Sequence, residues 1–407
     1  MTRRVDANLV AVVAVVALLV LAGCTAGGPI LANPSAPAPS IAAPTDQPVA
    51  IADPLPVVLP RDDGPHDRLT EWWYYTGHLV GAAADGPRRE FGFEYVIFRA
   101  ERGSFPTTWA SHLAITDETG DRFVYGQRLE VGEAVDRSPR DADGAPRGFD
   151  LSLHGIDPAD ASTFDRSAWG MSGSGGRDEL HASMSAAEAE VAGSPGGLGL
   201  ELIARAVKPP ALHDRDGWID FGPAGGSYYY SRTAMDASGT LTLDGQDIPV
   251  TGTAWFDHQW GDFISVGGGG WDWFAVNLDD GTDLTLSLVR DADGSYPLIY
   301  GTVVDPDGTT RHLERDAFTV DVIDQWTSPA SGANYPAGWT IGIPGEDDLR
   351  LELRPTVAAQ ELDTRATTGV IYWEGSQIVR GTRAGVPIGG EAYVELTGYA
   401  PSGLAVP

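Results

Sequence analysis

The sequence has a single cysteine, Cys24, among 407 residues. With no second thiol, an internal disulfide and a thiolate metal site are both excluded. Basic residues are also scarce, because 27 Lys and Arg stand against 57 Asp and Glu, which gives a formal net charge of −30. Such an acidic chain repels phosphate groups, so we expect no nucleic acid partner.

The apolar run near the N-terminus, Leu9–Ala22, is shorter than the roughly 18–20 residues that cross a bilayer. It follows two arginines and ends in small residues, which is typical of an export signal. Cys24 comes directly after Ala22 and Gly23, and this arrangement resembles the lipobox of bacterial lipoproteins. We therefore expect residues 1–23 to be removed and Cys24 to be acylated, which anchors the exported protein to the outer face of the cytoplasmic membrane. A plain signal peptide with an incidental cysteine is the alternative.

Residues 24–60 lack apolar periodicity and are rich in Pro, Ala, Gly and Ser, which predicts a flexible tether. The rest of the chain is too long for one ordinary core. We expect two domains, at 61–265 and 266–407, that meet at the glycine run Gly267–Gly270.

Helical periodicity is weak, and Ala182–Val191 is the best short helical candidate. Short apolar or alternating runs, such as Phe91–Phe98 and Leu284–Val289, are separated by turn-forming residues and predict a mainly β protein. Asp-x-Asp-Gly recurs, for example at Asp291–Gly294, and could be a calcium loop. Because the full ligand set of an EF-hand is missing, we interpret these segments as hairpin turns.

The mature chain repeats itself. Trp72–Leu79 aligns with Trp271–Leu278, with tryptophan first, leucine last and two aromatic matches between them. Gly252–Asp257 aligns with Gly390–Glu395, with an aromatic residue and a carboxylate at matching positions. The length of the repeat fits neither a solenoid nor a propeller blade, so it indicates one architecture built twice.

Each copy continues into a strand that ends in arginine, Arg99 in the first and Arg290 in the second. A tryptophan on the first strand with a later arginine is typical of lipocalin-like barrels, which can hold one small ligand. We expect two tandem lipocalin-like (calycin-type) barrels, each closed by its arginine stacking on Trp72 or Trp271.

Several aromatic-rich blocks distributed over residues 60 to 400 carry a family resemblance. They are Glu71-Trp-Trp-Tyr74, Gly77-His-Leu79, Phe98-Arg99, Ser227-Tyr-Tyr-Tyr-Ser231, Trp255-Phe-Asp-His-Gln-Trp-Gly261, Gly270-Trp-Asp-Trp273, Tyr372-Trp-Glu-Gly375 and Tyr393–Tyr399. The chain resembles the AttH-like and carotenoid 1,2-hydratase (hydroxyneurosporene synthase) family, in particular its exported branch of "predicted secreted hydrolases". The resemblance implies two lipocalin-like domains. The hydratase branch adds water to the terminal double bond of a long isoprenoid, whereas the exported branch has no established substrate.

The densest polar and aromatic group is Asp257-His258-Gln259-Trp260. In the hydratase interpretation, Asp257 is the candidate acid and His258 the base that orients water, because a buried carboxyl can donate a proton near neutral pH. Their side chains point to opposite faces of a strand, so only one of them faces a lumen unless a bulge intervenes. Trp73, Trp260, Trp271 and Trp273 are the candidate pocket walls, next to the domain junction. The alternative is that Asp257 and His258 only hold the domains together.

Glu71, His78, His112 and Glu374 are further candidates for substrate contact, although each also suits a structural role. A metal site of His78, His112 and His258 is conceivable, since imidazole suits zinc. No His-x-His or His-Glu-x-x-His spacing supports it, so we expect no metal and no cofactor.

The label "hydrolase" finds little support, because the chain has no Gly-x-Ser-x-Gly elbow and no cysteine nucleophile besides the lipidated one. Two functions remain open. One is an enzyme, a hydratase, isomerase or hydrolase acting on an apolar, isoprenoid-like or lipid-like molecule. The other is a binding or carrier protein for a hydrophobic small molecule. The sequence leaves the oligomeric state open.

Overall fold

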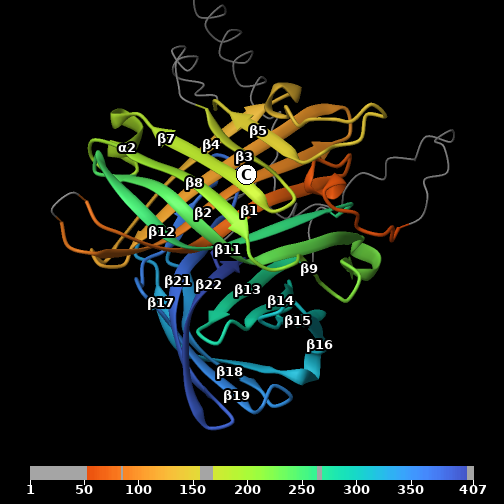
Figure 1. The fold of residues 1–407 in the computed structure, drawn as a ribbon, viewed down its shortest axis with the longest axis vertical. Coiled ribbons are helices and arrows are strands. Elements are labelled where there is room, and N and C mark those ends of the chain that lie inside the picture. The colour runs from red at the N-terminus through yellow and green to blue at the C-terminus, as the bar shows by residue number, and fades with distance from the viewer. Residues whose placement is uncertain (1–52, 84–85, 156–167, 264–267, 401–407) are drawn as a thin grey trace, which may run out of the picture.

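The computed structural model describes residues 53–83, 86–155, 168–263 and 268–400, and these form two antiparallel β-sheets stacked one on the other (Figure 1). Cys24 and the predicted export signal lie outside the described residues. Residues 53–60, which the sequence placed in the tether, contact the first sheet: Asp53 pairs with Arg68, and the backbone N–H of Leu55 donates to the Tyr228 hydroxyl at 2.6 Å. None of the helices among the described residues is long and apolar enough to cross a membrane.

The first sheet has the order β4-β3-β2-β1-β12-β11-β8-β7-β6-β5, and β9 and β10 pair with β11. Its two end regions meet, because β4 contacts β5, so the sheet curls into a barrel. Its strands are β1 (Thr70–Gly81), β2 (Arg89–Arg102), β3 (Phe105–Asp117), β4 (Arg122–Val131), β5 (Phe149–Leu153), β6 (Trp169–Ser174), β7 (Arg177–Met184), β8 (Leu198–Ala206), β9 (Ala211–Leu212), β10 (Trp218–Asp220), β11 (Gly226–Leu243) and β12 (Gln246–Gly261).

The second sheet has the order β16-β15-β14-β13-β22-β21-β19-β18-β17, and β20 pairs with β21. Its strands are β13 (Gly268–Leu278), β14 (Asp283–Asp291), β15 (Leu298–Val304), β16 (Thr310–Leu313), β17 (Thr319–Thr327), β18 (Asn334–Ile343), β19 (Leu349–Pro355), β20 (Glu361–Asp363), β21 (Ile371–Arg383) and β22 (Val386–Thr397). The described helices are short: η1 (Arg61–Asp63), η2 (Glu133–Val135), α2 (Ala186–Val191), η4 (Gly222–Ala224) and η5 (Arg315–Ala317).

Strand order and register agree with the sequence repeat. In the first sheet β1 lies between β2 and β12, and in the second β13 lies between β14 and β22. Leu79 pairs with Gly252 and Leu278 pairs with Gly390, so the two aligned segments have the same register in both copies. Trp72 and Trp271 occupy equivalent positions. The mainly β fold with two lipocalin-like sheets is therefore confirmed.

The helical candidate at Ala182–Val191 is shorter than predicted. Residues up to Met184 continue β7, and α2 begins only at Ala186. Ser185 sets this start, because its side chain accepts a hydrogen bond from the backbone N–H of Glu188, and the Glu188 carboxylate accepts one in return from the backbone N–H of Ser185.

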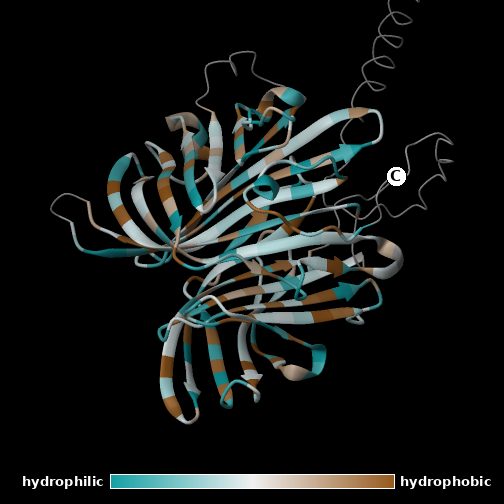
Figure 2. Ribbon diagram, turned by 45° about the vertical axis from the view of Figure 1, so that its right-hand side comes forward, coloured by the Kyte–Doolittle hydropathy of each residue, from teal (hydrophilic) through white to brown (hydrophobic). Residues whose placement is uncertain are grey.

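Alternation along the strands divides the apolar residues between a core inside each sheet and a layer between the sheets. Figure 2 shows the resulting bands of hydrophobic and hydrophilic residues along the strands. On β1, Trp73 and Tyr75 belong to the core of the first barrel, whereas Tyr74 belongs to the layer between the domains. Tyr74 is joined there by Trp273 and Tyr393 of the second sheet.

The two sheets pack through equivalent strands. Strand β2 contacts β21, and the equivalent pair, β14 and β11, is also in contact. His112 of β3 meets Tyr372 of β21 on one side, and Tyr300 of β15 clusters with Tyr229 of β11 on the other. This exchange of equivalent partners means that the repeats are related by an approximate two-fold axis through the interface.

The predicted stacking of Arg99 and Arg290 on Trp72 and Trp271 is wrong. The Arg99 guanidinium lies 5.8 Å from the ring of Trp109, and that of Arg290 lies 3.9 Å from the ring of Tyr399. Arg99 pairs in register with Glu71, the neighbour of Trp72, so its side chain points to the opposite face of the sheet.

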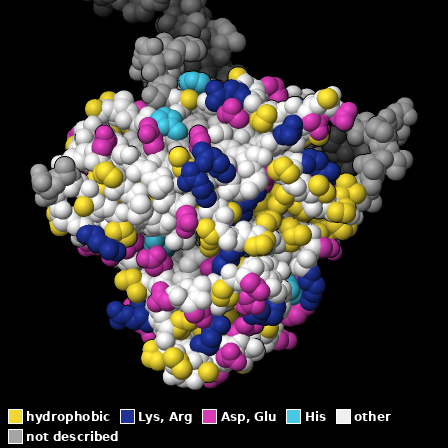
Figure 3. Space-filling view, in the orientation of Figure 1, with side chains coloured by type: hydrophobic (Ala, Val, Ile, Leu, Met, Phe, Trp, Pro, Cys, Tyr) yellow, Lys and Arg dark blue, Asp and Glu magenta, His cyan; other side chains and the backbone are white. Residues whose placement is uncertain are grey.

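Acidic and basic side chains are interspersed on the face of the molecule in Figure 3, and hydrophobic side chains gather on one side near the junction of the domains.

Candidate functional site between the two domains

A cavity of about 80 Å³ lies between the two sheets. Its walls are aromatic and come from both domains, and two carboxyl groups, Asp257 of β12 and Glu395 of β22, line it. These two residues occupy equivalent positions in the repeat, since Asp257 pairs with Tyr74 and Glu395 pairs with Trp273. The aromatic walls are Trp72, Tyr74, Phe98, Phe221, Tyr229, Phe263, Trp271, Trp273 and Tyr300.

Asp257 accepts three hydrogen bonds within its own domain. The Trp255 indole N–H donates to Oδ1 at 2.7 Å, the Ser231 hydroxyl also bonds to Oδ1, and the Tyr229 hydroxyl donates to Oδ2 at 2.5 Å. Burial raises the pKa of Asp257 to about 6, although all three hydrogen bonds favour the ionised form. Near neutral pH this group is therefore mostly a carboxylate with a fixed orientation.

Glu395 has fewer partners. The Trp271 indole N–H donates to its Oε2 at 2.8 Å, and its side chain is only partly buried against the cavity. Burial raises the pKa of Glu395 to about 7, and the charge of Asp257 adds to this effect. The cavity therefore holds two acidic groups of different pKa, and neither forms a salt bridge within the described part of the chain.

Two further carboxyl groups are buried in the same layer. Glu374 accepts a hydrogen bond from the Tyr74 hydroxyl at 2.6 Å, and Glu94 accepts one from the Tyr372 hydroxyl at 2.8 Å. Burial raises the pKa of Glu94 to about 8, and burial together with the nearby charge of Glu94 raises the pKa of Glu374 well above its usual value. At a pKa of about 8, Glu94 is mostly protonated at neutral pH.

His112 also lies in this layer, and its two ring nitrogens are engaged. Nδ1 lies 2.8 Å from the Tyr372 hydroxyl and Nε2 lies 3.0 Å from Thr367 Oγ1. Burial lowers the pKa of His112 to about 3, so the ring is neutral. This arrangement suits a residue that joins the domains.

His78 lies at the far end of β1, outside the cavity. Its Nε2 is 3.2 Å from the carbonyl oxygen of Ala392, and its Nδ1 is 3.5 Å from Glu118. Burial opposes the charged form of this ring, but the carboxylates of Glu118 and Glu391 and the carbonyl group of Ala392 together raise the pKa of His78. His78, His112 and His258 do not converge, because His258 lies inside the barrel.

A hydrogen-bonded chain extends from Asp257 into the second domain. Ser231 Oγ lies 2.7 Å from His213 Nε2, and His213 Nδ1 lies 2.9 Å from Thr302 Oγ1 of β15. The His213 ring also packs on the ring of Tyr229, with the centroids 4.0 Å apart. Sequence reasoning missed Ser231, Tyr229 and His213 as site residues. The alternation of Tyr229 and Ser231 on one face of the Ser227–Ser231 block is the signal that could have identified the first two.

The structure does not bring the predicted site residues together in one pocket. Trp271, Trp273 and Asp257 line the interdomain cavity, whereas His258 and Trp260 point into the first barrel. Trp73 pairs in register with His258 and lies on the same inner face. The expected pocket of four tryptophans is thus divided by β12, which has no bulge between Asp257 and Trp260.

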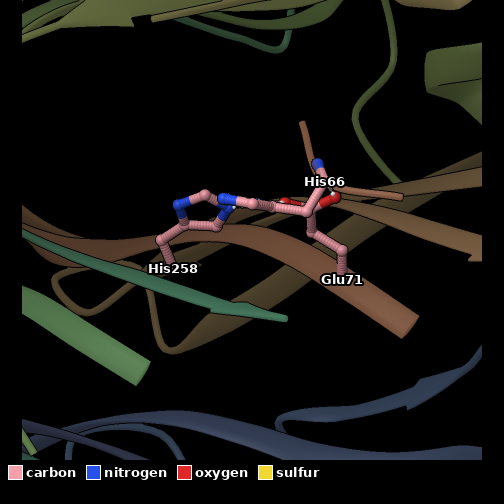
Figure 4. Close-up of side chains that lie close together, drawn as sticks. All are labelled: His66, Glu71 and His258. Carbon is pink, nitrogen blue, oxygen red and sulfur yellow. Dashed lines mark hydrogen bonds and ion pairs between the residues drawn. The ribbon is translucent and has the colours of Figure 1, made fainter. Parts of the chain in front are cut away.

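Inside the barrel, Glu71 lies between two histidines (Figure 4). Its Oε1 is 2.7 Å from His66 Nδ1 and 2.9 Å from His258 Nε2. Burial alone would raise the pKa of Glu71, but the charge of His66 and the hydrogen bonds from both rings lower it to about 2. Burial lowers the pKa of His258, and Glu71 offsets this only in part. These three residues are the group within the described residues whose ligand atoms are close enough to share a metal ion.

The comparisons with known proteins agree with this architecture. The profile of the AttH-like family matches residues 50–399. The chain belongs to the AttH-like family. A crystal structure of an AttH protein from Nitrosomonas europaea is similar to it at 30% identity and a TM-score of 0.68, covering 85% of this chain and 98% of that one.

Kievitone hydratase from Nectria haematococca has 14% identity to this AttH-like protein and a TM-score of 0.60, and the match covers 84% of this chain and 93% of that one. At this identity the likeness establishes the shared fold alone. The comparison with curated proteins gives no match. The chemistry of this AttH-like protein must therefore be argued from its own residues.

Proposed function

We propose that this AttH-like protein adds water to a carbon–carbon double bond at the end of an apolar molecule, by acid catalysis in the interdomain cavity. One observation carries the proposal: Asp257 and Glu395, whose pKa values are about 6 and about 7, line a cavity with aromatic walls and have no basic partner among the described residues. Two acidic groups whose environments separate their pKa values are suited to act as a base and an acid in one site.

The surroundings of the two carboxyl groups favour Glu395 as the acid and Asp257 as the base. Glu395 has the higher pKa and is accessible from the cavity, so its protonated form donates a proton to the alkene carbon. The cation that forms at the neighbouring carbon is stabilised by the faces of Trp271 and Trp273. Asp257, held as a carboxylate by its three donors, takes a proton from water as the water oxygen forms the new C–O bond. Asp257 then returns this proton to Glu395, so the enzyme ends in its starting state.

This assignment differs from the one that the sequence suggested, in which Asp257 was the acid and His258 the base. His258 lies on the opposite face of β12 and does not reach the cavity. Both repeats carry a carboxylate at the position of Glu395, which by itself also suits a structural role. Its partial exposure to the cavity is what favours a catalytic role.

The size of the cavity favours a reaction at the end of a molecule. At about 80 Å³ it is smaller than the roughly 300–1,000 Å³ of pockets that enclose whole ligands. An isoprenoid-like or lipid-like molecule would place only its terminal group there, among Trp72, Tyr74 and Trp273. An apolar substrate also fits the aromatic lining.

The experiment tests whether water is incorporated into an apolar molecule, and it uses water enriched in a heavy isotope of oxygen. The full-length protein is incubated with a lipid extract in this water, and the extract is analysed by mass spectrometry before and after incubation. We expect an apolar species to gain one water that carries the heavy oxygen, and we expect the Glu395→Gln protein to form this product about 100- to 10,000-fold more slowly. If an unchanged apolar molecule co-purifies and no labelled product forms, the hydratase proposal is wrong and the alternative, a carrier of hydrophobic molecules, is supported.

The proposal also includes a location. A lipid anchor on Cys24 and a tether that follows it would hold the domains at the outer face of the cytoplasmic membrane, close to a supply of apolar substrate. The match of the AttH-like profile from residue 50 onward is compatible with an N-terminal segment that serves only for export and anchoring.

A further inference from the structure

We propose that His66, Glu71 and His258 form a binding site for a divalent transition-metal ion inside the mouth of the first barrel. This site goes beyond the proposed hydratase function, because it lies on the opposite face of β12 from Asp257 and does not depend on the cavity chemistry.

The three ligand atoms come from three separate parts of the chain. His66 lies in the loop between η1 and β1, Glu71 lies on β1, and His258 lies on β12. All three atoms are within 4.8 Å of one another. Ligand atoms that surround one zinc ion at about 2.0–2.2 Å must be this close together.

The residue types select the class of metal. Two imidazole nitrogens and one carboxylate oxygen form a common zinc-binding set, and imidazole also suits cobalt, nickel and copper. Calcium and magnesium prefer sites built of oxygen ligands alone. We therefore assign the site to Zn²⁺ or an ion of similar preference.

The two imidazole rings are already held in place. The His66 ring stacks on Trp260 with the centroids 4.0 Å apart and the planes 1° from parallel. The His258 ring stacks on Trp73 at 4.7 Å and packs against Trp260 at 4.6 Å. Rings fixed by packing lose little freedom when an ion binds, which favours binding.

The neighbouring groups resemble the outer shell of a metal site. Asp62 Oδ1 lies 3.6 Å from Nε2 of His66, the ring nitrogen that does not face Glu71. Histidines that bind metals commonly direct their second nitrogen toward a carboxylate in this way. Glu71 Oε2 accepts a hydrogen bond from the backbone N–H of His66 at 3.0 Å, which leaves Oε1 to face both rings.

The site also has an entry path. Glu71 and His258 are fully buried, but the side chain of His66 is 19% exposed. A bound ion would connect the η1–β1 loop to β12 and so close one side of the barrel mouth. Without an ion, Oε1 of Glu71 lies within hydrogen-bond distance of both rings, at the nitrogen atoms that would bind the ion.

The test is spectroscopic and starts with the wild-type full-length protein. After treatment with a chelator, the protein is titrated with Co²⁺. We expect one ion per chain, visible absorption bands typical of a tetrahedral site, displacement by Zn²⁺ and no displacement by excess Ca²⁺.

Variants then locate the ion. His66→Ala, at the exposed ligand, should abolish the cobalt spectrum, and Asp62→Asn should weaken binding by about 10- to 100-fold. The matched control is His181→Ala, since His181 and Glu201 form a similar pair at the surface, 3.4 Å apart, and this variant should bind as the wild type does. The proposal is overturned if the wild type gives no tetrahedral spectrum, if Ca²⁺ displaces the ion, or if folded His66→Ala protein binds Co²⁺ unchanged.

Discussion

The hydrogen bonds around Asp257 and Glu395 make two chemically similar side chains behave differently. Three donors fix Asp257, whereas one indole holds Glu395. Burial raises the pKa of Asp257 to about 6 and that of Glu395 to about 7, and the hydrogen-bond donors oppose this rise at both groups. A shared site with such a difference can hold one proton between two carboxyl groups near neutral pH.

The rate of water addition should therefore depend on pH as a bell-shaped curve. It should rise as Asp257 ionises near pH 6 and fall as Glu395 ionises near pH 7, so that the maximum lies between these values. The measurement is kcat/KM as a function of pH for the labelled-water reaction. A rate that rises steadily up to pH 9 would contradict the assignment.

Removal of either carboxyl group should reduce the rate by about 100- to 10,000-fold, because positioned proton transfer contributes this much. Asp257→Asn and Glu395→Gln keep the size of each side chain, so thermal unfolding should show folded protein. The control is Glu391→Gln, at an exposed position four residues earlier on β22, which should leave the rate unchanged. Equal rates in all three variants would mean that the pair is structural.

The equivalent positions in the two repeats could be predicted from the sequence. Which of the predicted site residues share the interdomain cavity could not. Trp72 and Trp271 were aligned correctly, because their aromatic neighbours recur in the same order. The opposite directions of Asp257 and His258 also follow from strand alternation. The sequence does not show which face of β12 meets the second domain, so Trp260 and Trp271 were placed in one pocket. His66 was missed because it lies in an irregular loop and reaches Glu71 and His258 only through the folding of that loop over the barrel mouth.

The contact of β2 with β21 depends on Gly92, a residue without a side chain. A Cβ atom at Gly92 would lie 2.7 Å from Ser376 Cβ and 3.2 Å from Tyr393 Cε2, both in the second domain. The two sheets can approach this closely only because Gly92 is a glycine. Ser376 in turn donates a hydrogen bond to Glu118 of the first domain at 2.6 Å, so the position of this strand pair affects polar contacts as well.

Gly92→Ala should therefore destabilise the protein by about 1–3 kcal/mol, the usual cost of overpacking. The free energy of unfolding in urea is the appropriate measurement. Gly345→Ala is the matched control, because a Cβ atom there meets nothing within 4 Å, and its effect should stay within about 0.5 kcal/mol. If both variants unfold at the same urea concentration, the interface accommodates a Cβ atom at residue 92, and the close approach of β2 and β21 does not require Gly92.

The buried carboxyl groups of the interface make the stability of the protein depend on pH. Glu94, Glu374 and Glu395 have raised pKa values, so the folded protein keeps protons there that the unfolded chain releases near pH 4.5. Buried histidines with lowered pKa values, such as His112 and His213, have the opposite effect, because the unfolded chain binds protons there and the folded protein does not. This effect is confined to pH values below about 6.5, the usual pKa of histidine. Above about pH 6.5 the folded state therefore binds more protons than the unfolded state, and its stability must fall as pH rises.

The melting temperature should decrease steadily from pH 6.5 to 8.5. For each proton that the folded state retains and the unfolded state has lost, the free energy of unfolding falls by about 1.4 kcal/mol per pH unit. Glu94→Gln should reduce the slope, because an amide of the same size does not titrate, and the variant should be more stable than the wild type at pH 8.5. A melting temperature that rises over this range would show that the interface carboxyl groups are ionised in the folded protein.

Cys24→Ala tests the proposed anchor. We expect the wild type to partition with membranes after expression in a bacterial host and the variant to be recovered in the soluble fraction or with its signal segment intact. Mass spectrometry of the N-terminal peptide should show the lipid on the wild type alone. Membrane association that is equal in both proteins would contradict lipid anchoring at this residue.

The approximate two-fold axis between the repeats has a consequence for the history of the molecule. A single repeat on its own would expose the aromatic face that now lies between the sheets, and such a face pairs with a second copy of itself. Because β2 meets β21 while β14 meets β11, the two halves contact each other as the subunits of a symmetric dimer would. Joining two such subunits in one chain frees each copy to change separately. Asp257 in one half and Glu395 in the other occupy equivalent positions but differ in type. A dimer of identical subunits cannot have such an asymmetry.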